Sequence, residues 1–404
     1  MIELSVEAAL ARLLAGCAVL DAIEIVSEAA AGYVLLQDVY APHALPMFKS
    51  AAVDGFAVVA NDLAQASPDH PVVLPIAGVV TAGGPITPII VPGSTIRVMN
   101  GAVLPGGASA VLPREDVQER PNTCVAFMQP VVEGQHIRDV GEDVPDQALV
   151  IPAGKLLRPA EVGLLCALGI PYVQVVRRPR VALLPTGDAL LAPGRSLTPG
   201  KVRDANTPAL AAFVADQGAQ PLRYSIVRDH QSELYQRIET AISDGADLVL
   251  ISTGMGSVSV ETILAGLMQR YQGETWQLHI RPGRMLWSGR IGQVTLLGLP
   301  GDPLDALILA ELFVAPLIQK LRGMPYEEHR LVAVTLQEPQ ISAPQRQYVR
   351  AHVQREGQGY IASTKGIGTG SGSLRSLVQA NALLIIPEGD SVWPVGSVVD
   401  ALLF

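Results

Sequence analysis

The sequence predicts a multidomain α/β plus β protein, in which a central doubly wound αβ domain is preceded by β-rich N-terminal domains and followed by a small C-terminal β-barrel-like domain. The chain has 404 residues, which is too long for one ordinary hydrophobic core. Between about residues 181 and 322, apolar strands alternate with helical patterns, as in a parallel sheet covered by helices on both faces. Elsewhere short apolar runs alternate with turns, and the chain holds 38 Gly and 31 Pro but only 4% aromatic residues.

The first part of the chain contains two predicted helices separated by strands. Over 5–15, apolar residues recur at helical spacing behind Ser5, which can cap the first turn. From about 22 to 150, short apolar runs lie between Gly and Pro clusters, so this stretch is expected to be mostly β. A second helix is predicted over 159–168, opened by a proline and closed by a glycine.

The αβ part follows a basic connector at 177–180 and ends at the turn 323–325. Its strands are predicted at 181–184, near 225–227, at 248–252, and ending near Ile280 and Leu297; its helices are predicted after Pro208, at about 231–244, near 259–270 and from 303 to about 322. The remaining residues return to short strands and Gly-rich turns such as 366–372.

We expect four domains from these shifts in pattern. They are an N-terminal linker domain (1–22, 41–48 and 144–177), a β-rich domain (23–40 and 49–143), an αβ domain (178–325) and a small C-terminal β domain (326–404).

Composition restricts the class of protein. The net charge of -9 argues against a broad basic surface for nucleic acid or anionic lipid, so an anionic ligand must be held by local donors. Three widely spaced cysteines indicate neither a disulfide framework nor a zinc site. The acidic start lacks a signal-peptide pattern, and the most apolar helix, 303–321, is interrupted by Asp305 and Glu311. We therefore expect a cytoplasmic protein that binds neither membrane nor nucleic acid.

Three Gly-containing turns follow strands of the predicted sheet, where ligands of doubly wound folds bind. A Gly lets the backbone approach a ligand, hydroxyls and amide groups before a helix suit an oxyanion, and an Asp before Pro can cap a helix. Each turn alone is also consistent with ordinary turn chemistry, but three on one sheet edge favour a site. The phosphate-loop and dinucleotide signatures are absent, which argues against a nucleotide-hydrolysing motor. The turns lie at 184–188, 252–257 and 298–303.

Charged residues elsewhere add candidates. Arg281 and Arg284 flank a Pro-Gly turn and could clamp phosphate or molybdate, or simply be solvated. Asp54 lies among small residues, and Asp143 follows Arg138 in a similar loop. Each of these acids is also consistent with a capping residue in a loop.

Taken together, these segments resemble the MoeA and gephyrin E-domain family of molybdopterin molybdotransferases over nearly the whole chain. The order and spacing of the motifs carry the resemblance. They are 50–57 (S-A-V-D-G-F-A around Asp54), 97–102, 141–143, 186–188, 204–206, 298–303, 348–351, 370–374 and 380–381.

The resemblance implies an elongated homodimer whose active site lies between the αβ, molybdopterin-binding domain of one subunit and the β-rich region of the other. It implies insertion of molybdate into adenylylated molybdopterin with release of AMP, in the presence of Mg²⁺. Molybdopterin and molybdate would be substrates, and a molybdopterin adenylyltransferase or a molybdoenzyme would be further partners.

Matching positions give the expected site residues. The catalytic residues would be Asp54, Asp143, Asp188 and Asp229, and the metal would be held by Asp188, Asp229 and Glu261. The cofactor-binding residues would be Asn100, Arg138, Thr186, Gly187, Ser252, Gly254, Gly256, Ser257, Arg281, Arg284, Pro300, Gly301, Asp302, Pro303, Arg350 and Ser371.

Several positions depart from the family pattern. Ala189 replaces an acid, Asp302 and Asn100 replace Asn and Thr, and Thr253 replaces a glycine whose backbone could need positive φ. Arginines replace the lysines of the family at 281 and 284. We therefore expect ligand binding with slower turnover. Two alternatives stay open: a non-catalytic or repurposed paralogue that binds pterin or nucleotide phosphate as a carrier or partner, and hydrolysis of a nucleotide or pyrophosphate.

Overall fold

The computed structural model of the chain describes residues 2–85, 89–228, 230–253, 265–325, 331–368 and 374–404. The chain folds into two compact units. The first unit comprises Met1–Leu36, Gly154–Pro159 and Tyr172–Phe404, and the second comprises Gln37–Ala153 and Ala160–Pro171.

The first unit is built on a seven-stranded sheet in the order β1-β20-β22-β23-β19-β15-β18. The strands β23, β19, β15 and β18 run parallel, whereas β22 is antiparallel to both of its neighbours. Strand β1, from the start of the chain, pairs in parallel with β20. The strands are β1 (Ile2–Leu4), β15 (Arg180–Pro185), β18 (Gln220–Arg223), β19 (Leu248–Thr253), β20 (Glu274–Leu278), β22 (Met285–Ile291) and β23 (Val294–Pro300).

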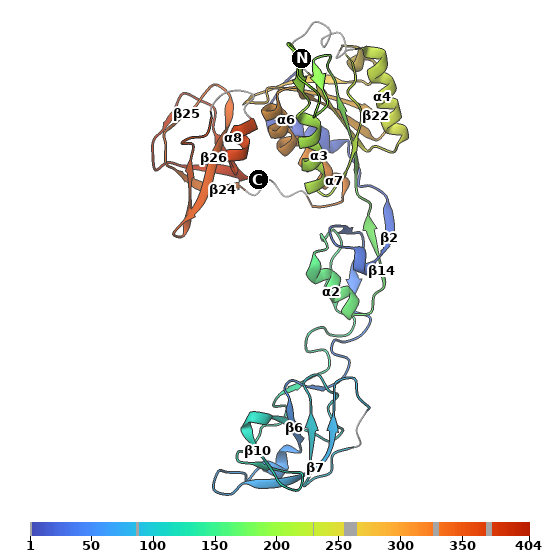
Figure 1. Cartoon of the computed structure of the whole chain (residues 1–404), viewed down its shortest axis with the longest axis vertical. Coiled ribbons are helices and arrows are strands. Elements are labelled where there is room, and N and C mark those ends of the chain that lie inside the picture. The colour runs from blue at the N-terminus through green and yellow to red at the C-terminus, as the bar shows by residue number, and fades with distance from the viewer. Residues whose placement is uncertain (1, 86–88, 229, 254–264, 326–330, 369–373) are drawn as a thin grey trace. The chain divides into compact units, whose positions relative to one another are not determined.

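Helices cover both faces of this sheet, as Figure 1 shows. Successive residues of a strand point to opposite faces, so β15 sends Val181 and Leu183 into one core and Ala182 and Leu184 into the other. The first core packs α1 (Val6–Ala15), α3 (Asn206–Asp216), α6 (Pro303–Leu309), the π-helical turn η4 (Ala310–Val314) and α7 (Ala315–Leu321). The second core packs α4 (Gln231–Ser243) and the helical residues 265–270.

The predicted fold class is confirmed, and most predicted elements of this sheet are present. Helix α1 begins after Ser5, whose hydroxyl accepts a hydrogen bond from the Ala8 N–H at 3.1 Å. The predicted helices over 231–244 and 303–322 and the strands over 181–184 and 248–252 also form. Of the helix predicted near 259–270, only residues 265–270 lie within the described residues, and these are helical.

The strand predicted near 225–227 is wrong. The strand is β18, four residues long, and it pairs with β15 from Arg180 to Leu183. It lies at the sheet edge and is half exposed, so its apolar signal is weak. The more apolar residues after it supply one isolated bridge, from Val227 to Thr186. The antiparallel strand β22 was not among the predicted strands.

The C-terminal part of the first unit forms a closed barrel. Its strands follow the order β26-β27-β24-β30-β28, and β28 also pairs with β26, which closes the ring. A separate cluster of buried side chains fills it. The elements are β24 (Leu331–Leu336), β26 (Arg346–Glu356), β27 (Gly359–Ser363), α8 (Leu374–Gln379), β28 (Ala382–Ile386) and β30 (Val398–Leu403), with β21 (Ile280–Arg281) on β26 and a ribbon of β25 (Gln340–Ile341) and β29 (Val392–Trp393).

A small three-stranded sheet completes the first unit. It consists of β2 (Ala22–Val26), β14 (Tyr172–Val176) and β3 (Val34–Leu35). Arg322 at the end of α7 is buried and donates to the carbonyl oxygen of Gly32 at 2.7 Å and to that of Gln217 at 2.8 Å. These bonds fix the small sheet to the helices of the αβ part.

The second unit is β-rich, as the sequence predicts. Its main sheet has the order β10-β11-β7-β8-β6-β9, packed around Phe56 and Phe127. Helix α2 (Pro159–Ala167) forms where a helix was predicted over 159–168, and the turn after it contains Gly169, with φ +68°. The strands are β4 (Val39–Tyr40), β5 (Ser50–Ala51), β6 (Gly55–Val58), β7 (Val72–Val80), β8 (Thr95–Val98), β9 (Ala110–Pro113), β10 (Val117–Arg120), β11 (Cys124–Phe127), β12 (Ile137–Arg138) and β13 (Leu149–Ile151), and short 3-10 helices lie at Ala60–Leu63 and Arg114–Asp116. A further 3-10 helix, Ser27–Ala29, belongs to the first unit.

Within the ranges that the structure describes, no helix is both long and apolar enough to cross a membrane. The cysteines Cys17, Cys124 and Cys166 are all unbridged.

Candidate active site

Asn206 connects the turns after two neighbouring parallel strands. It is the first residue of α3, it is 6% exposed, and its Nδ2 donates to Ser252 Oγ at 2.8 Å and to the carbonyl oxygens of Pro300 at 3.3 Å and Gly301 at 3.1 Å. Its Oδ1 is buried and has no hydrogen-bond partner among the described residues. An unpartnered buried acceptor is costly, which fits a group kept for a ligand donor.

Asn206 was not among the predicted site residues. Its motif, 204–206, contributed to the family resemblance only. The signal that could have identified it is an amide residue placed directly before a predicted helix, at the edge where the turns were expected to meet. Asp204, two residues before this helix, accepts a hydrogen bond from the Thr207 N–H of its first turn at 3.0 Å.

Thr186 connects the end of a third strand, β15, to the end of β19. Its backbone N–H and its hydroxyl both donate to the carbonyl oxygen of Ser252, at 2.9 and 3.1 Å. Gly187 has φ +144° and donates from its N–H to the Val227 carbonyl at 3.0 Å. The ends of β15, β19 and β23 therefore lie together at one edge of the sheet. Thr253 is the last residue of β19 and is extended, so no positive φ is required of it there.

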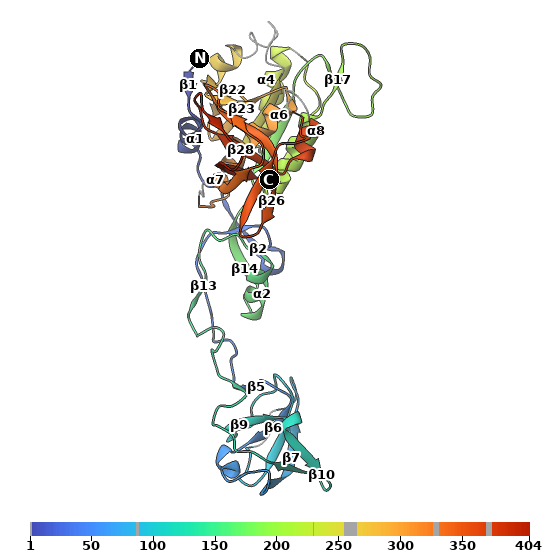
Figure 2. The same cartoon turned by 90° about the vertical axis from the view of Figure 1, so that its left-hand side faces the viewer.

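Asp188 follows as an exposed carboxylate at this edge. Its Oδ1 lies 3.8 Å from Nη1 of Arg228, and its carbonyl oxygen accepts from Lys201 Nζ at 2.6 Å. The next residue, Ala189, acts through its backbone and accepts from the Val202 N–H at 2.9 Å. The contacts with Lys201 and Val202 hold a long loop that includes the paired strands β16 (Leu190–Leu191) and β17 (Val202–Arg203), visible in Figure 2.

The turn after β23 begins α6 as predicted. Asp302 is the N-cap, Pro303 occupies the first turn, and Asp302 Oδ1 accepts from the Leu304 N–H at 2.9 Å. Burial, together with the charge of Asp302, raises the pKa of Asp305. This part of the edge is therefore rich in carboxylates.

Arg350 of the barrel contributes a cation to the same region. Burial lowers the pKa of Arg350, and the negative charge of Asp302 opposes this effect. Its Nη1 donates to Ser376 Oγ at 2.7 Å. A residue predicted from the tail is therefore in electrostatic range of one predicted from the αβ part.

Arg281 and Arg284 lie on a turn that reaches the start of α6. Both are exposed, and the Gly283 N–H between them donates to the carboxylate of Asp305. Gly283 has φ +85°, and a Cβ there would lie 3.1 Å from the side chain of Leu309. Glycine at this position lets the turn pack directly against the helix.

The second unit holds the remaining described candidates. Asp54 Oδ1 accepts from the Asn100 N–H at 2.7 Å, so these two predicted residues are in direct contact. Gly55 has no room for a side chain, because a Cβ would collide with the carbonyl oxygen of Leu112. Arg138 pairs with Ser50 across β12 and β5, and Asp143 donates its N–H to the Leu45 carbonyl at 3.1 Å.

Some predicted residues lie outside the described residues. They are Asp229, Gly254, Gly256, Ser257, Glu261 and Ser371. Among the described residues, no group of three or more His, Cys, Asp or Glu side chains is arranged to hold a metal ion.

Comparison with protein-family models gives three consecutive matches. Residues 4–169 match the MoeA N-terminal region (domain I and II), residues 182–320 match a "Probable molybdopterin binding domain", and residues 333–404 match the MoeA C-terminal region (domain IV).

Individual proteins and structures agree with these matches. The chain is 34% identical to molybdopterin molybdenumtransferase 2 of Mycobacterium tuberculosis over 369 residues, covering 89% of each chain. It is 30% identical to the molybdopterin molybdenumtransferase of Bacillus subtilis over 376 residues, covering 91% of this chain and 86% of the relative. The crystal structure of the molybdopterin biosynthesis MoeA protein from Pyrococcus horikoshii superposes with a TM-score of 0.82 at 29% identity, over 100% of both chains. The chain therefore belongs to the MoeA family, whose members include these molybdopterin molybdenumtransferases.

Proposed function

We propose that this protein is a molybdopterin molybdenumtransferase, which takes adenylylated molybdopterin, releases AMP and inserts molybdate to form molybdenum cofactor. The observation that carries the proposal is the junction at Asn206, which holds the ends of β19 and β23 together beside Thr186. In parallel α/β sheets, the carboxyl ends of the strands are where ligands bind. Membership of the MoeA family supports the same assignment.

The described residues at this edge suit an anionic substrate. Backbone groups of the turns at 186–188 and 300–303 can approach phosphate closely. Arg281 and Arg284 are exposed guanidinium groups beside the same edge, and guanidinium binds phosphate or molybdate oxygens through two parallel hydrogen bonds. Arg350 would add a third cation from the barrel.

The carboxylates fit a divalent cation. Oxygen donors are the ligands that Mg²⁺ prefers, and Asp188 presents an exposed carboxylate at the edge. We assign Mg²⁺ to Asp188 together with Asp229 and Glu261, which lie outside the described residues. Bound Mg²⁺ would neutralise charge on the phosphate oxygens. In the same proposal Asp188 and Asp229 are catalytic, and Asp188 orients the phosphate through the cation.

We further propose a homodimer of four-domain subunits, with the domain boundaries expected from the sequence. In this dimer Asp54, Asn100, Arg138 and Asp143 of one subunit complete the site of the other. The exposed carboxylate of Asp54, fixed by the Asn100 N–H, supports a role in binding rather than in packing. We also propose that the protein works in the cytoplasm, which is consistent with its three unbridged cysteines.

The first experiment measures the reaction. Purified protein is incubated with adenylylated molybdopterin, molybdate and Mg²⁺, and AMP release and reconstitution of a molybdoenzyme are followed. The double variant Arg281→Ala/Arg284→Ala should lose most AMP release, whereas Arg355→Ala, an exposed arginine on β26, should keep it. Tight ligand binding with neither AMP release nor cofactor formation would overturn the proposal in favour of a non-catalytic binding protein.

A second experiment tests the shared site. Asp54→Ala and Asp188→Ala should each inactivate the homodimer, because each removes a residue from every site. In a heterodimer of the two variants, one site would hold both substitutions and the other would be intact. Co-expressed, differently tagged subunits should therefore regain about half of the activity per heterodimer. A heterodimer that stays inactive would refute the contribution of one subunit to the other's site.

A further inference from the structure

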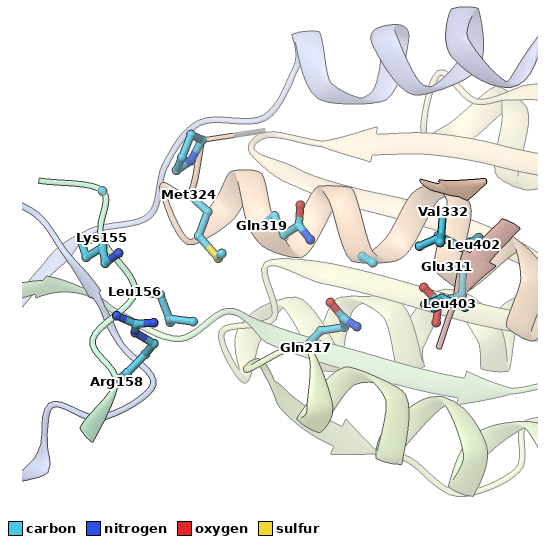
Figure 3. Close-up of a pocket in the computed structure, with 13 residues that line it drawn as sticks. Lys155, Leu156, Arg158, Gln217, Glu311, Gln319, Met324, Val332, Leu402 and Leu403 are labelled. Atoms are coloured by element: carbon cyan, nitrogen blue, oxygen red, sulfur yellow. The ribbon is translucent and has the colours of Figure 1, made fainter. Parts of the chain in front are cut away.

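The barrel and the αβ part of the first unit meet along two stretches that differ in packing. Along one of them, α7 and η4 face the barrel strands β24 and β30 across a cavity of about 680 Å³ (Figure 3). In this cavity Glu311 lies beside Val332 and Leu402 of the barrel. Along the other stretch, helix α8 of the barrel contacts α6, whose N-cap is Asp302. The contact of α8 with α6 is therefore the one that connects the barrel to the candidate active site.

Helix α8 is fixed to both parts. Leu377 is partly buried and packs against the first core of the αβ part. Just after the helix, Asn381 bonds β26 through its whole amide group. Its Nδ2 donates to the Val353 carbonyl at 2.9 Å, and its Oδ1 accepts from the Val353 N–H at 2.7 Å. Helix α8 therefore cannot shift along β26 without breaking both bonds.

Arg350 lies on the face of β26 that is turned toward the αβ part. Its cross-strand partner is Leu383 of β28, and directly opposed residues share one face of a sheet. Leu383 is 1% exposed and belongs to the first core of the αβ part, as does Tyr348, two residues before Arg350. The negative charge of Asp302 acts on the Arg350 guanidinium. Arg350 therefore projects from the barrel toward the start of α6.

Ser376 fixes the guanidinium group itself. It is the buried residue of α8, 1% exposed, and its hydroxyl accepts from Arg350 Nη1 at 2.7 Å. A short bond from a charged donor is among the stronger hydrogen bonds in proteins. Arg346, on the same face of β26, is paired with the carboxylates of Glu7 and Glu388, which offset its charge. A hydroxyl carries no charge, so the bond to Ser376 orients the guanidinium of Arg350 without neutralising it.

We propose that Ser376 is a positioning residue of the candidate active site, which holds the guanidinium of Arg350 in place to bind an oxyanion of the substrate. Ser376 does not touch the substrate and acts through Arg350. A side chain that is already ordered loses less conformational entropy when its ligand binds, so the affinity for the oxyanion is higher. The inference rests on the proposed function, in which Arg350 is one of the cations that bind the substrate.

A double-mutant cycle in the full chain tests the proposal. Binding of AMP and of molybdate, each with Mg²⁺, is measured by calorimetry for the parent, Ser376→Ala, Arg350→Ala and the double variant. The probe that Arg350→Ala weakens identifies the oxyanion. Ser376→Ala should weaken binding of the same probe about tenfold, which corresponds to one hydrogen bond to a charged group. In the Arg350→Ala background it should have no further effect, because the hydroxyl then has no guanidinium to hold.

Two further variants separate positioning from stability. Ser376→Thr keeps the hydroxyl and should bind the probe nearly as well as the parent. Ser342→Ala is the matched control, because Ser342 is another buried serine of the barrel, 8% exposed, whose hydroxyl accepts from Trp393 Nε1 at 3.0 Å. It loses a comparable hydrogen bond, so its Tm should fall about as far as that of Ser376→Ala, while its affinity for the probe should not change.

Three results would overturn the proposal. The first is parent-like binding of both probes by Ser376→Ala. The second is a double variant in which the two effects add, because the serine would then act independently of Arg350. The third is an equal loss of affinity in Ser342→Ala. Failure of the proposed function is a different result: the parent itself would bind neither probe and release no AMP, which would overturn both proposals.

Discussion

Glu311→Gln should stabilise the protein at pH 8 and have little effect at pH 5. In the folded protein burial, with the charge of Asp216, raises the pKa of Glu311 from 4.5 to about 7. The charged form is therefore disfavoured by folding. Glutamine has nearly the same shape as the protonated side chain but cannot ionise.

The size of the effect follows from linkage. Because the folded pKa is the higher one, the unfolded chain loses its proton first as pH rises. The stability associated with neutral Glu311 is complete below pH 4.5 and is lost between pH 4.5 and about 7. At about 1.36 kcal/mol per pH unit, the charged form costs on the order of 3 kcal/mol at pH 8 and under about 1 kcal/mol at pH 5.

Thermal melts between pH 5 and pH 8 measure this difference. Glutamine should raise Tm relative to the parent by roughly 5–10 °C at pH 8, and the gap should shrink steadily toward pH 5. Glu356→Gln, an exposed site on β26, is the matched control and should show no such trend. A Tm gap that is constant with pH, or that grows toward pH 5, would refute the reasoning from burial.

Three further predictions concern the frame of the site. Asn206→Ala removes three hydrogen bonds, two of which are to the buried Ser252 hydroxyl and the buried Pro300 carbonyl, so urea unfolding should show a loss of about 2–3 kcal/mol; a loss below about 0.5 kcal/mol would contradict the role of this residue as a connector. Asp302→Ala removes the N-cap of α6 and should lower the free energy of unfolding by about 1 kcal/mol in thermal melts. Asp302→Asn keeps a capping side chain and should not lower it. Equal losses of stability in the two variants would argue against capping. Gly55→Ala places a Cβ against the carbonyl of Leu112 and should destabilise the second unit by about 1–3 kcal/mol, measured by limited proteolysis. In the control Gly106→Ala the added Cβ meets only ordinary contacts, so the free energy of unfolding should not change. If both variants resist cleavage by the protease equally well, the steric argument at Gly55 is wrong.

Local chemistry allowed much of the αβ part to be predicted. Ser5 and Asp302 cap helices because their short side chains reach the first free N–H groups, a requirement that is visible in sequence. The convergence of three turns followed from a general property of parallel sheets, and the bonds of Thr186 to Ser252 realise it.

Features that depend on distant partners could not be predicted in this way. Strand β22 contains Ser288, Gly289 and Arg290 and shows no clean alternation, so its pairing with two neighbouring strands decides its conformation. Asn206 has a local motif, but its importance lies in carbonyls almost a hundred residues away. The surroundings of Glu311 come from four separate parts of the chain, so the sequence showed it only as a charge that interrupts an apolar helix.

The pairing of β1 with β20 has a consequence for the order of folding. Ile2 to Leu4 are synthesised well before their partners Trp276 to Leu278, from which most of the chain separates them. Until then α1 also lacks the core into which Val6 and Leu10 pack. Pairing between such distant segments is slow to form and leaves apolar surface exposed in the meantime. The beginning of the chain should therefore be among the last parts to become protected from solvent during refolding, so that protection of its amides reports completion of the sheet.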